Sequence, residues 1–132
     1  MIVVIYLVVF LGAGLGGACR LGINEIAARL LGVVFPFGTL IINVVGAFFM
    51  GVLTEYFAFR GGVSQELRLF LTTGILGGFT TFSTFALESV VLWERGQWMP
   101  SVAYVVLSVF LSIAALIAGL AIVRLIISGQ TV

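Results

Sequence analysis

Four long apolar stretches limit what this chain can fold into more than any other feature of its sequence. They cover residues 2–31, 39–59, 65–93 and 100–127 of the 132, and 62% of all residues are hydrophobic whereas 8% are charged. A membrane-spanning helix needs about 20 mostly apolar residues, so each stretch is long enough to cross a bilayer once. We therefore expect an all-α integral membrane protein, a single four-helix domain over residues 1–132, that crosses a membrane four times.

Several residue types are missing, and their absence removes whole classes of function. The sequence contains no histidine, lysine or aspartate, and its six basic residues are all arginine. Histidine-dependent catalysis, most metal-ligand clusters and the P-loop lysine are thereby excluded. Ser83 has no GxSxG setting. No basic tract is present to hold nucleic acid. We expect neither an enzyme nor a nucleic-acid-binding protein.

The third apolar stretch carries the most polar segment found at membrane depth, TTGILGGFTTFSTFALE, from Thr72 to Glu88. It combines the pair Gly77-Gly78, six hydroxyl groups and one carboxylate. Backbone groups in a bilayer must be satisfied internally, so irregular backbone is tolerated only where protein or a watery cavity surrounds it. The third helix is 29 residues long, and we expect it to be broken at Gly77-Gly78 and to line a route for something polar or charged.

The first helix combines small residues with one basic residue. Gly12 and Gly16 form a GxxxG pattern, which predicts a close contact with another helix. Arg20 follows one turn later, with Asn24 on the same face. Arg20 can extend to the lipid headgroups, or it can lie at the mouth of an anion route, because ionisable residues within a membrane are functional candidates.

Two further helices carry polar stripes. Asn43 lies near the middle of the second helix, on a small and polar face. Tyr104, Ser108 and Ser112 advance by four residues along the fourth. Such stripes serve helix packing in many membrane proteins. Together with the hydroxyl groups of the third helix, they also suit the lining of a polar route.

The arginines give almost no preference for one orientation in the membrane. With both termini on one side, three arginines lie on each side: Arg60, Arg68 and Arg124 against Arg20, Arg29 and Arg95. Short-loop arginine asymmetry sets orientation, and none is present here. Four helices can hardly enclose a conduit alone. We therefore predict a dual-topology homodimer, in which two antiparallel copies are related by a twofold axis in the membrane plane.

The hydrogen-bond donors of these segments suit a dehydrated anion. Hydroxyl groups and the Asn43 amide can donate, and Glu88 is the one carboxylate near mid-membrane. Phe82 and Phe85 share one side of the third helix, and the edges of aromatic rings carry positive partial charge. By spacing alone, these two rings are better explained as core residues.

Two motifs carry a specific resemblance over the whole chain. Gly38 to Asn43, GTLIIN, followed by Gly77 to Phe85, GGFTTFSTF, and then by Glu88, closely resembles the CrcB/Fluc family of fluoride channels. The resemblance implies a dual-topology antiparallel dimer with two separate pores, through which cytoplasmic fluoride leaves passively, and with a structural Na⁺ at the dimer axis. The resemblance likewise implies a multi-pass channel of the cell's inner (plasma) membrane, whose partners would be fluoride, sodium and a second copy of itself.

The resemblance also implies roles for individual residues. Backbone carbonyls of Gly77 and Thr80 would hold the Na⁺. On the fluoride route, Phe82 and Phe85 would be the ring pair and Asn43 the amide donor. The polar track would consist of Ser83, Thr84, Tyr104, Ser108 and Ser112. Arg20 would be the cation of the vestibule, and Glu88 would lie beside the route. The chain departs from many relatives at Leu116, where they carry threonine, so the outer part of the track is in question.

Two other functions fit a small four-helix membrane protein. A proton-coupled drug exporter needs a carboxylate buried in its first helix, and Glu25, near the end of that helix and beside Arg29, is the candidate. A non-conducting membrane scaffold would need only GxxxG and the small-residue stripes. Proton-coupled uptake of a lipophilic cation would identify the exporter, and absence of any ion flux would identify the scaffold.

Overall fold

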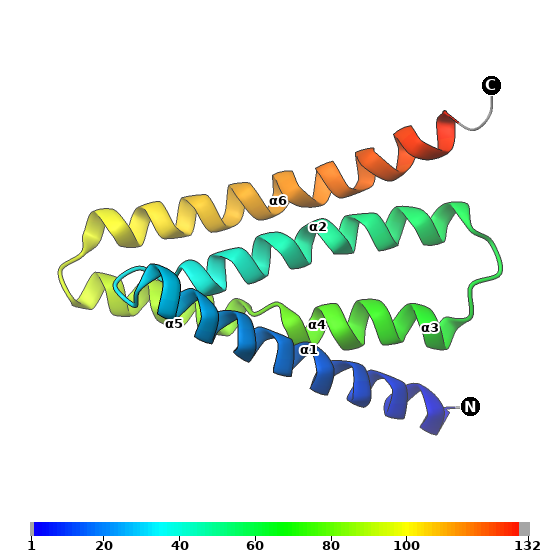
Figure 1. Cartoon of the computed structure of the whole chain (residues 1–132), viewed down its shortest axis with the longest axis horizontal. Helices are drawn as coiled ribbons and strands as arrows, with labels where there is room; N and C mark the ends of the chain where they lie inside the picture. The colour runs from blue at the N-terminus through cyan, green and yellow to red at the C-terminus, as the bar shows by residue number, and fades with distance from the viewer. Residues whose placement is uncertain (1, 130–132) are drawn as a thin grey trace.

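The structure, a computed structural model, describes residues 2–129 and is helical throughout this range apart from short turns (Figure 1). Its elements in chain order are α1 (Ile2–Leu31), α2 (Phe37–Phe59), α3 (Gln65–Leu69), η1 (Phe70–Leu76), α4 (Gly77–Phe79), α5 (Phe82–Glu94) and α6 (Trp98–Ser128). The short segments from α3 to α5 form one interrupted span, and η1 is π-helical. Four helices are long and apolar enough to cross a membrane, which confirms the predicted four-span class.

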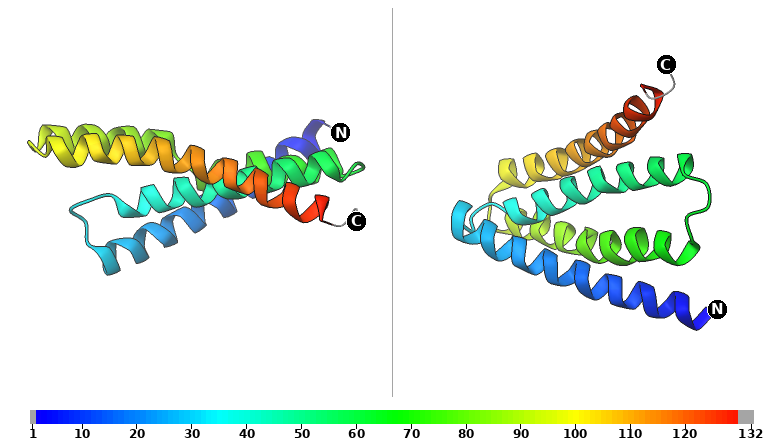
Figure 2. Two further views of the ribbon diagram at one scale, coloured as in Figure 1. Left: turned by 90° about the horizontal axis from the view of Figure 1, so that it is seen from above. Right: turned by 45° about the vertical axis from the view of Figure 1, so that its right-hand side comes forward.

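The four spans lie side by side, with their connections at the two ends of the molecule. Figure 1 shows both termini and the α2–α3 turn at one end, and the α1–α2 and α5–α6 turns at the other. Figure 2 shows that the α1–α2 pair and the α5–α6 pair diverge toward the end that holds the two short turns. The spans α2 and α6 begin at Phe37 and Trp98, two residues earlier than expected, directly after Pro36 and Gln97.

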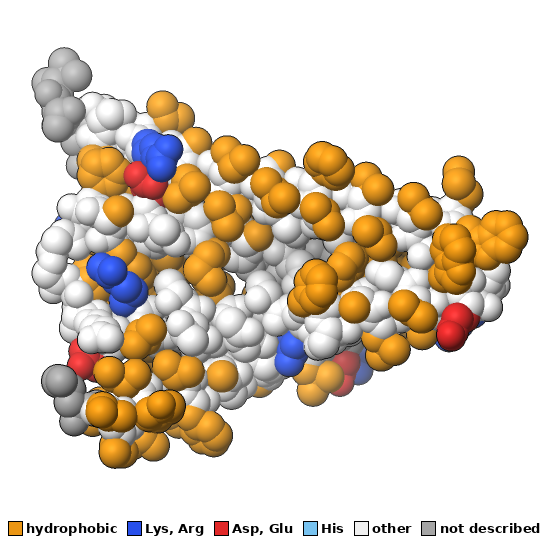
Figure 3. All heavy atoms as spheres, turned by 180° about the vertical axis from the view of Figure 1, so that it is seen from behind, with side chains coloured by type: hydrophobic (Ala, Val, Ile, Leu, Met, Phe, Trp, Pro, Cys, Tyr) orange, Lys and Arg blue, Asp and Glu red, His pale blue; other side chains and the backbone are white. Residues whose placement is uncertain are grey.

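The outer surface is apolar along the whole length of the spans. Figure 3 shows hydrophobic side chains over the visible face and few charged ones. Large side chains such as Phe10 and Phe110 are 73% and 70% exposed. Hydrophobic side chains facing outward along four spans suit a hydrocarbon environment, as expected of a multi-pass membrane protein.

Glycines of α1 let the third span approach closely. A Cβ added at Gly12 would lie 2.7 Å from the carbonyl oxygen of Phe70, and one at Gly16 would overlap the carbonyl of Ile75. Gly78 faces α1 in the same way, because a Cβ there would overlap the carbonyl of Ala13. The close contact predicted from Gly12 and Gly16 is therefore confirmed, with η1 and α4 as the partners.

A second glycine contact joins α2 to α6. A Cβ at Gly51 would overlap the carbonyl oxygen of Leu116, and one at Gly119 would overlap that of Phe48. Backbone atoms cannot move aside as a flexible side chain can. The two helices therefore depend on both glycines for their separation.

We expect Gly119→Ala to lower the free energy of unfolding by about 1–3 kcal/mol, because the added methyl group forces α2 and α6 apart. Thermal unfolding of the purified protein in detergent measures the change. Gly14→Ala is the matched control, since no atom lies within 4 Å of a Cβ built there and alanine favours helix over glycine. Equal melting temperatures for the two variants would contradict the proposed role of Gly119.

The third span is interrupted, as predicted, but the non-helical residues are Thr80 and Thr81 rather than Gly77-Gly78. Thr80 has φ −78° and ψ 158°, and Thr81 has φ −153° and ψ 118°, whereas Gly77 keeps helical angles of −64° and −38°. Gly78 is required for the contact with α1, not for a bend. The break falls where side chains supply alternative partners for the backbone.

Candidate functional site

Asn43 holds the break of the third span together. Its Nδ2 donates to the carbonyl of Thr81 (3.0 Å), and the Thr81 N–H donates back to its Oδ1 (2.8 Å). The Thr81 hydroxyl in turn accepts from the Thr84 N–H (3.2 Å) and caps α5. Gly46, one turn beyond Asn43, leaves room for the Thr80 methyl group. The side chain of Asn43 thus replaces the helical bonds that the break removes.

A cavity of about 360 Å³ adjoins the break, and we refer to it as the central cavity. It is bounded by α2, the break, α5 and α6, and its lining residues are Asn43, Gly46, Ala47, Met50, Thr80, Thr81, Phe82, Phe85, Ser108, Val109, Ser112, Ile113 and Leu116. Five residues of the predicted fluoride route therefore meet here: Asn43, Phe82, Phe85, Ser108 and Ser112. None of the lining side chains is acidic.

Ser108 provides a free hydroxyl group at this cavity. The residue is 6% exposed, and its Oγ has no hydrogen-bond partner among the described residues. A buried hydroxyl without a partner is costly, so its presence calls for an explanation. A bound polar species in the central cavity would supply the missing partner.

We expect Ser108→Ala to reduce anion flux several-fold without lowering stability, because the hydroxyl contributes no hydrogen bond to the fold. Paired measurements of ion efflux from liposomes and of the melting temperature separate the two effects. Ser101→Ala is the control. The Ser101 hydroxyl donates to the Ser89 carbonyl at 2.8 Å, so its loss should lower stability and leave flux unchanged. The reverse pattern would count against Ser108 as a ligand.

The carboxylate of Glu88 gathers two hydroxyl donors from other spans. Thr39 donates to its Oε1 (3.0 Å) and Tyr104 to its Oε2 (2.7 Å). Tyr104 is fully buried, and its ring lies 5.3 Å from that of Phe85, measured between ring centroids. Tyr104 therefore connects the central cavity, which Phe85 lines, to Glu88.

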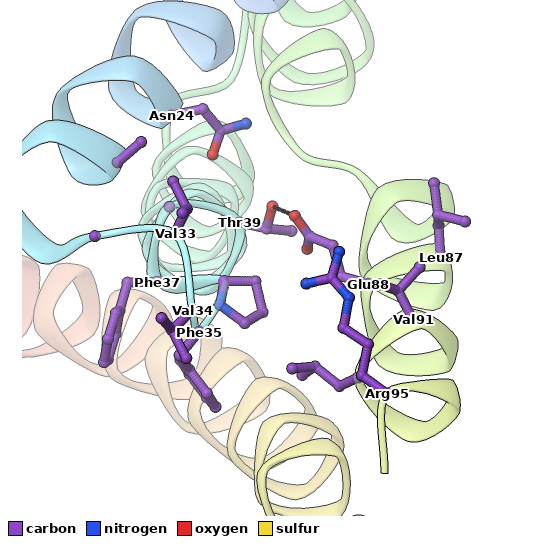
Figure 4. Close-up of a pocket in the computed structure, with 15 residues that line it drawn as sticks. Asn24, Val33, Val34, Phe35, Phe37, Thr39, Leu87, Glu88, Val91 and Arg95 are labelled. Atoms are coloured by element: carbon purple, nitrogen blue, oxygen red, sulfur yellow. Dashed lines mark hydrogen bonds between the residues drawn. The ribbon is translucent and has the colours of Figure 1, made fainter. Parts of the chain in front are cut away.

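Glu88 also borders a second cavity of about 370 Å³, the outer cavity, at the end of the molecule that holds the α1–α2 and α5–α6 turns. Its lining residues are Asn24, Ala28, Gly32, Val33, Val34, Phe35, Pro36, Phe37, Gly38, Thr39, Leu87, Glu88, Val91, Leu92 and Arg95. Figure 4 shows Thr39 bonded to Glu88, with Asn24 and Arg95 at either side. Phe85 contacts Tyr104 and Tyr104 contacts Glu88 between the two cavities, and we refer to the cavities and these side chains together as the polar track.

Five predicted site residues line neither cavity: Arg20, Gly77, Ser83, Thr84 and Tyr104. Ser83 is exposed, with its hydroxyl 3.3 Å from that of Thr81. Thr84 is half-buried, and its hydroxyl accepts from Thr81 at 3.1 Å. Arg20 is half-buried on α1 and lines neither cavity. Phe82 does line the central cavity, yet it is 79% exposed in the single chain.

Two residues of the track were not singled out as site residues from the sequence, Thr39 and Arg95. Thr39 stands in the GTLIIN motif one turn before Asn43, and this spacing was the available signal. Arg95 lies at the end of α5, where only the tertiary arrangement reveals its cavity.

Glu25, the candidate acid of an exporter, is exposed and lies 3.8 Å from Arg29, so it is not a buried proton carrier.

The carbonyls of Gly77 and Thr80 fit a cation held by backbone oxygens. The amides four residues later are engaged elsewhere, because the Thr81 N–H bonds Asn43 and the Thr84 N–H bonds the Thr81 hydroxyl. Backbone carbonyls at the break of a discontinuous helix coordinate Na⁺ in membrane transporters. In the part of the chain from 2 to 129, no three Cys, His, Asp or Glu side chains cluster as an alternative metal site.

Comparison with known proteins gives a consistent result over almost the whole chain. The family model described as CrcB-like protein, Camphor Resistance (CrcB), matches residues 7–120. A protein of Methylobacterium nodulans is 60% identical over 118 residues, which are 89% of this chain and 94% of the relative. Relatives from Rhodopseudomonas palustris and Granulibacter bethesdensis are 55% and 53% identical, over 90% and 94% of this chain and 96% and 98% of their own lengths. All three relatives are described as fluoride-specific ion channel FluC. Matches of this identity and extent place the chain in the CrcB family.

Proposed function

We propose that this chain forms a fluoride-specific ion channel through which fluoride leaves the cytoplasm passively. The observation that carries the proposal is the central cavity, whose mostly apolar lining includes four hydroxyl groups and one amide but no carboxylate. One of these hydroxyl groups, that of Ser108, has no hydrogen-bond partner among the described residues. Fluoride is small and strongly hydrated, so closely spaced donors must replace its water. The names of the relatives described above support the same ion.

The aromatic rings would complete the site. The rings of Phe82 and Phe85 lie 5.4 Å apart between centroids, and both border the central cavity. Ring edges carry positive partial charge, so a ring that turns its edge to the cavity stabilises an anion without a strong hydrogen bond. The remaining N–H of the Asn43 amide is a further donor, because only one of its two hydrogens is used by Thr81.

Glu88 would lie beside the route and keep two hydrogen-bond donors in position. Its carboxylate engages the hydroxyl groups of Thr39 and Tyr104 in the absence of an anion, which avoids leaving them unpaired. A fluoride ion that reaches this point competes for the same two donors. The polar track would continue along α6 from Tyr104 through Ser108 to Ser112, as far as Leu116.

We further propose an antiparallel homodimer with two pores and a structural Na⁺ at its axis. Phe82 is 79% exposed in one chain although it borders the cavity, and a second copy would cover it. The carbonyls of Gly77 and Thr80 from both copies would form the Na⁺ site. Ser83 and Thr84, beside the break, and Arg20, on α1, would reach the route only from such an assembly.

Cysteine labelling tests the orientation. In a Cys19→Ser background, Gln97→Cys and Ser128→Cys each introduce one thiol, at opposite ends of the molecule. We expect a membrane-impermeant maleimide to label about half of each variant from outside sealed vesicles, since the arginine balance favours neither orientation. Complete labelling at one position and complete protection at the other would contradict dual topology.

Fluoride efflux from liposomes tests the function itself. A fluoride-selective electrode should record release from vesicles that contain the purified protein and none from protein-free vesicles. The Ser108→Ala variant should release fluoride more slowly. Absence of release would favour the non-conducting scaffold.

A further inference from the structure

The outer cavity contains one pair of opposite charges whose function is not explained by the fold. Its ionisable lining residues are Glu88, on its inner side, and Arg95, at the end of α5. Figure 4 shows the guanidinium of Arg95 turned into the cavity, toward Glu88. An anion that enters from this end of the molecule therefore meets a cation first and a carboxylate second.

Arg95 differs from most arginines of the chain in having no partner of its own. Arg29 and Arg124 form ion pairs with Glu25 (3.8 Å) and Glu55 (2.8 Å). Arg60 and Arg68 lie over the rings of Tyr56 and Phe57, at 5.9 and 5.6 Å from the centroids. Within residues 2–129, no carboxylate lies within 4 Å of the Arg95 guanidinium, and the side chain is exposed to water.

The carboxylate of Glu88 provides a physical reason for the unpaired Arg95 cation in the outer cavity. Both oxygens of the Glu88 carboxylate accept hydrogen bonds, and a carboxylate carries charge of the same sign as an anion in the route. A like charge at the entrance lowers the local anion concentration, whereas a cation in the same cavity restores it. Arg95 is the one basic residue that lines the outer cavity.

We propose that Arg95 is the anion-collecting residue of the outer cavity, where its guanidinium offsets Glu88 and concentrates fluoride at the entrance of the track. This inference rests on the proposed function. Arg95 is a positioning residue that acts on the rate of entry, not a ligand in the central cavity. The competing explanation is that Arg95 only complements the dipole at the end of α5, which would affect stability and not ion entry.

Ionic strength distinguishes the two explanations. The Debye length falls from about 30 Å at 0.01 M to about 3 Å at 1 M, so collection of ions by an exposed charge is lost at high salt. Fluoride efflux is therefore measured with an electrode, from liposomes that hold gluconate salts of about 10 mM or about 500 mM on both sides. The proteins are the wild type, Arg95→Gln, Arg95→Lys and the control Arg29→Gln.

We expect Arg95→Gln to release fluoride about 3–10 times more slowly than the wild type at low ionic strength and within about twofold of it at high ionic strength. Arg95→Lys retains the charge and should match the wild type within about twofold. Arg29→Gln should match it under both conditions, because Arg29 lies in the last turn of α1, close to the α1–α2 turn, but does not line the outer cavity.

The inference is overturned if Arg95→Gln equals the wild type at low ionic strength, if its deficit persists at high ionic strength, if Arg95→Lys shares the deficit, or if Arg29→Gln shows the same loss. Melting temperatures of the four proteins show whether a deficit arises from unfolding. A wild-type protein that releases no fluoride at all would instead overturn the proposed function, and this inference with it.

Discussion

Asn43→Asp is expected to reduce fluoride efflux by at least about 100-fold. Asn43 both holds the break and borders the central cavity. A carboxylate cannot donate to the Thr81 carbonyl, and it places a negative charge beside the anion. At about 4 Å and an effective dielectric of about 20, repulsion between two unit charges is about 4 kcal/mol, which exceeds the 2.7 kcal/mol or so that corresponds to 100-fold.

Electrode recordings from liposomes at matched protein density measure the effect. Gln65→Glu is the control, because it makes the same exchange of an amide for a carboxylate at the exposed start of α3, where the residue lines neither cavity. Size-exclusion chromatography establishes that both variants assemble like the wild type. If Asn43→Asp kept more than half of the wild-type efflux, Asn43 would not be part of the route.

Phe85→Ile is expected to lower fluoride efflux by about tenfold or more. Phe85 is 8% exposed and lies between the central cavity and the ring of Tyr104. Isoleucine is apolar but has no positive ring edge to offer an anion. It also leaves space beside Tyr104, whose hydroxyl is bonded to Glu88. Both effects disturb the junction between the two cavities.

Phe10→Ile is the matched control, since Phe10 is 73% exposed on α1 and lines neither cavity. The electrode assay should show unchanged efflux for this variant. Phe82→Ile adds a test of assembly, because Phe82 is 79% exposed in one chain and can matter strongly only if a second copy covers it. Undiminished efflux through both Phe82→Ile and Phe85→Ile would remove the rings from the mechanism.

The spans and the close contact at Gly12 and Gly16 were predictable because they depend on local properties of the sequence. Length and apolarity define a span, and the spacing of Gly12 and Gly16 places both glycines on one face of α1. The position of the break was harder to predict from the sequence. Gly77-Gly78 suggested a break at the glycines, yet Gly78 is needed for close packing against Ala13. The break lies instead at Thr81, which is hydrogen-bonded to Asn43, 38 residues away in the chain.

The site was predictable as a set of residue types but not as a network. Asn43, Phe85 and Ser108 were identified, and the structure gathers them at one cavity. The bond between Thr39 and Glu88 joins residues 49 apart in sequence, so no periodicity reveals it. The sequence predicted Arg20 as a cation of the route because of its position within the first span. The cation that borders the outer cavity is instead Arg95, at the end of a helix.

The central claim is that donors in a narrow polar track replace the water of fluoride and of no larger halide. Parallel efflux of fluoride and chloride from the same liposome preparation, each with its own ion-selective electrode, tests it most directly. We predict fluoride release at least about 100 times faster than chloride release, which corresponds to a difference of about 2.7 kcal/mol between the two ions. Comparable rates for the two ions would contradict the account.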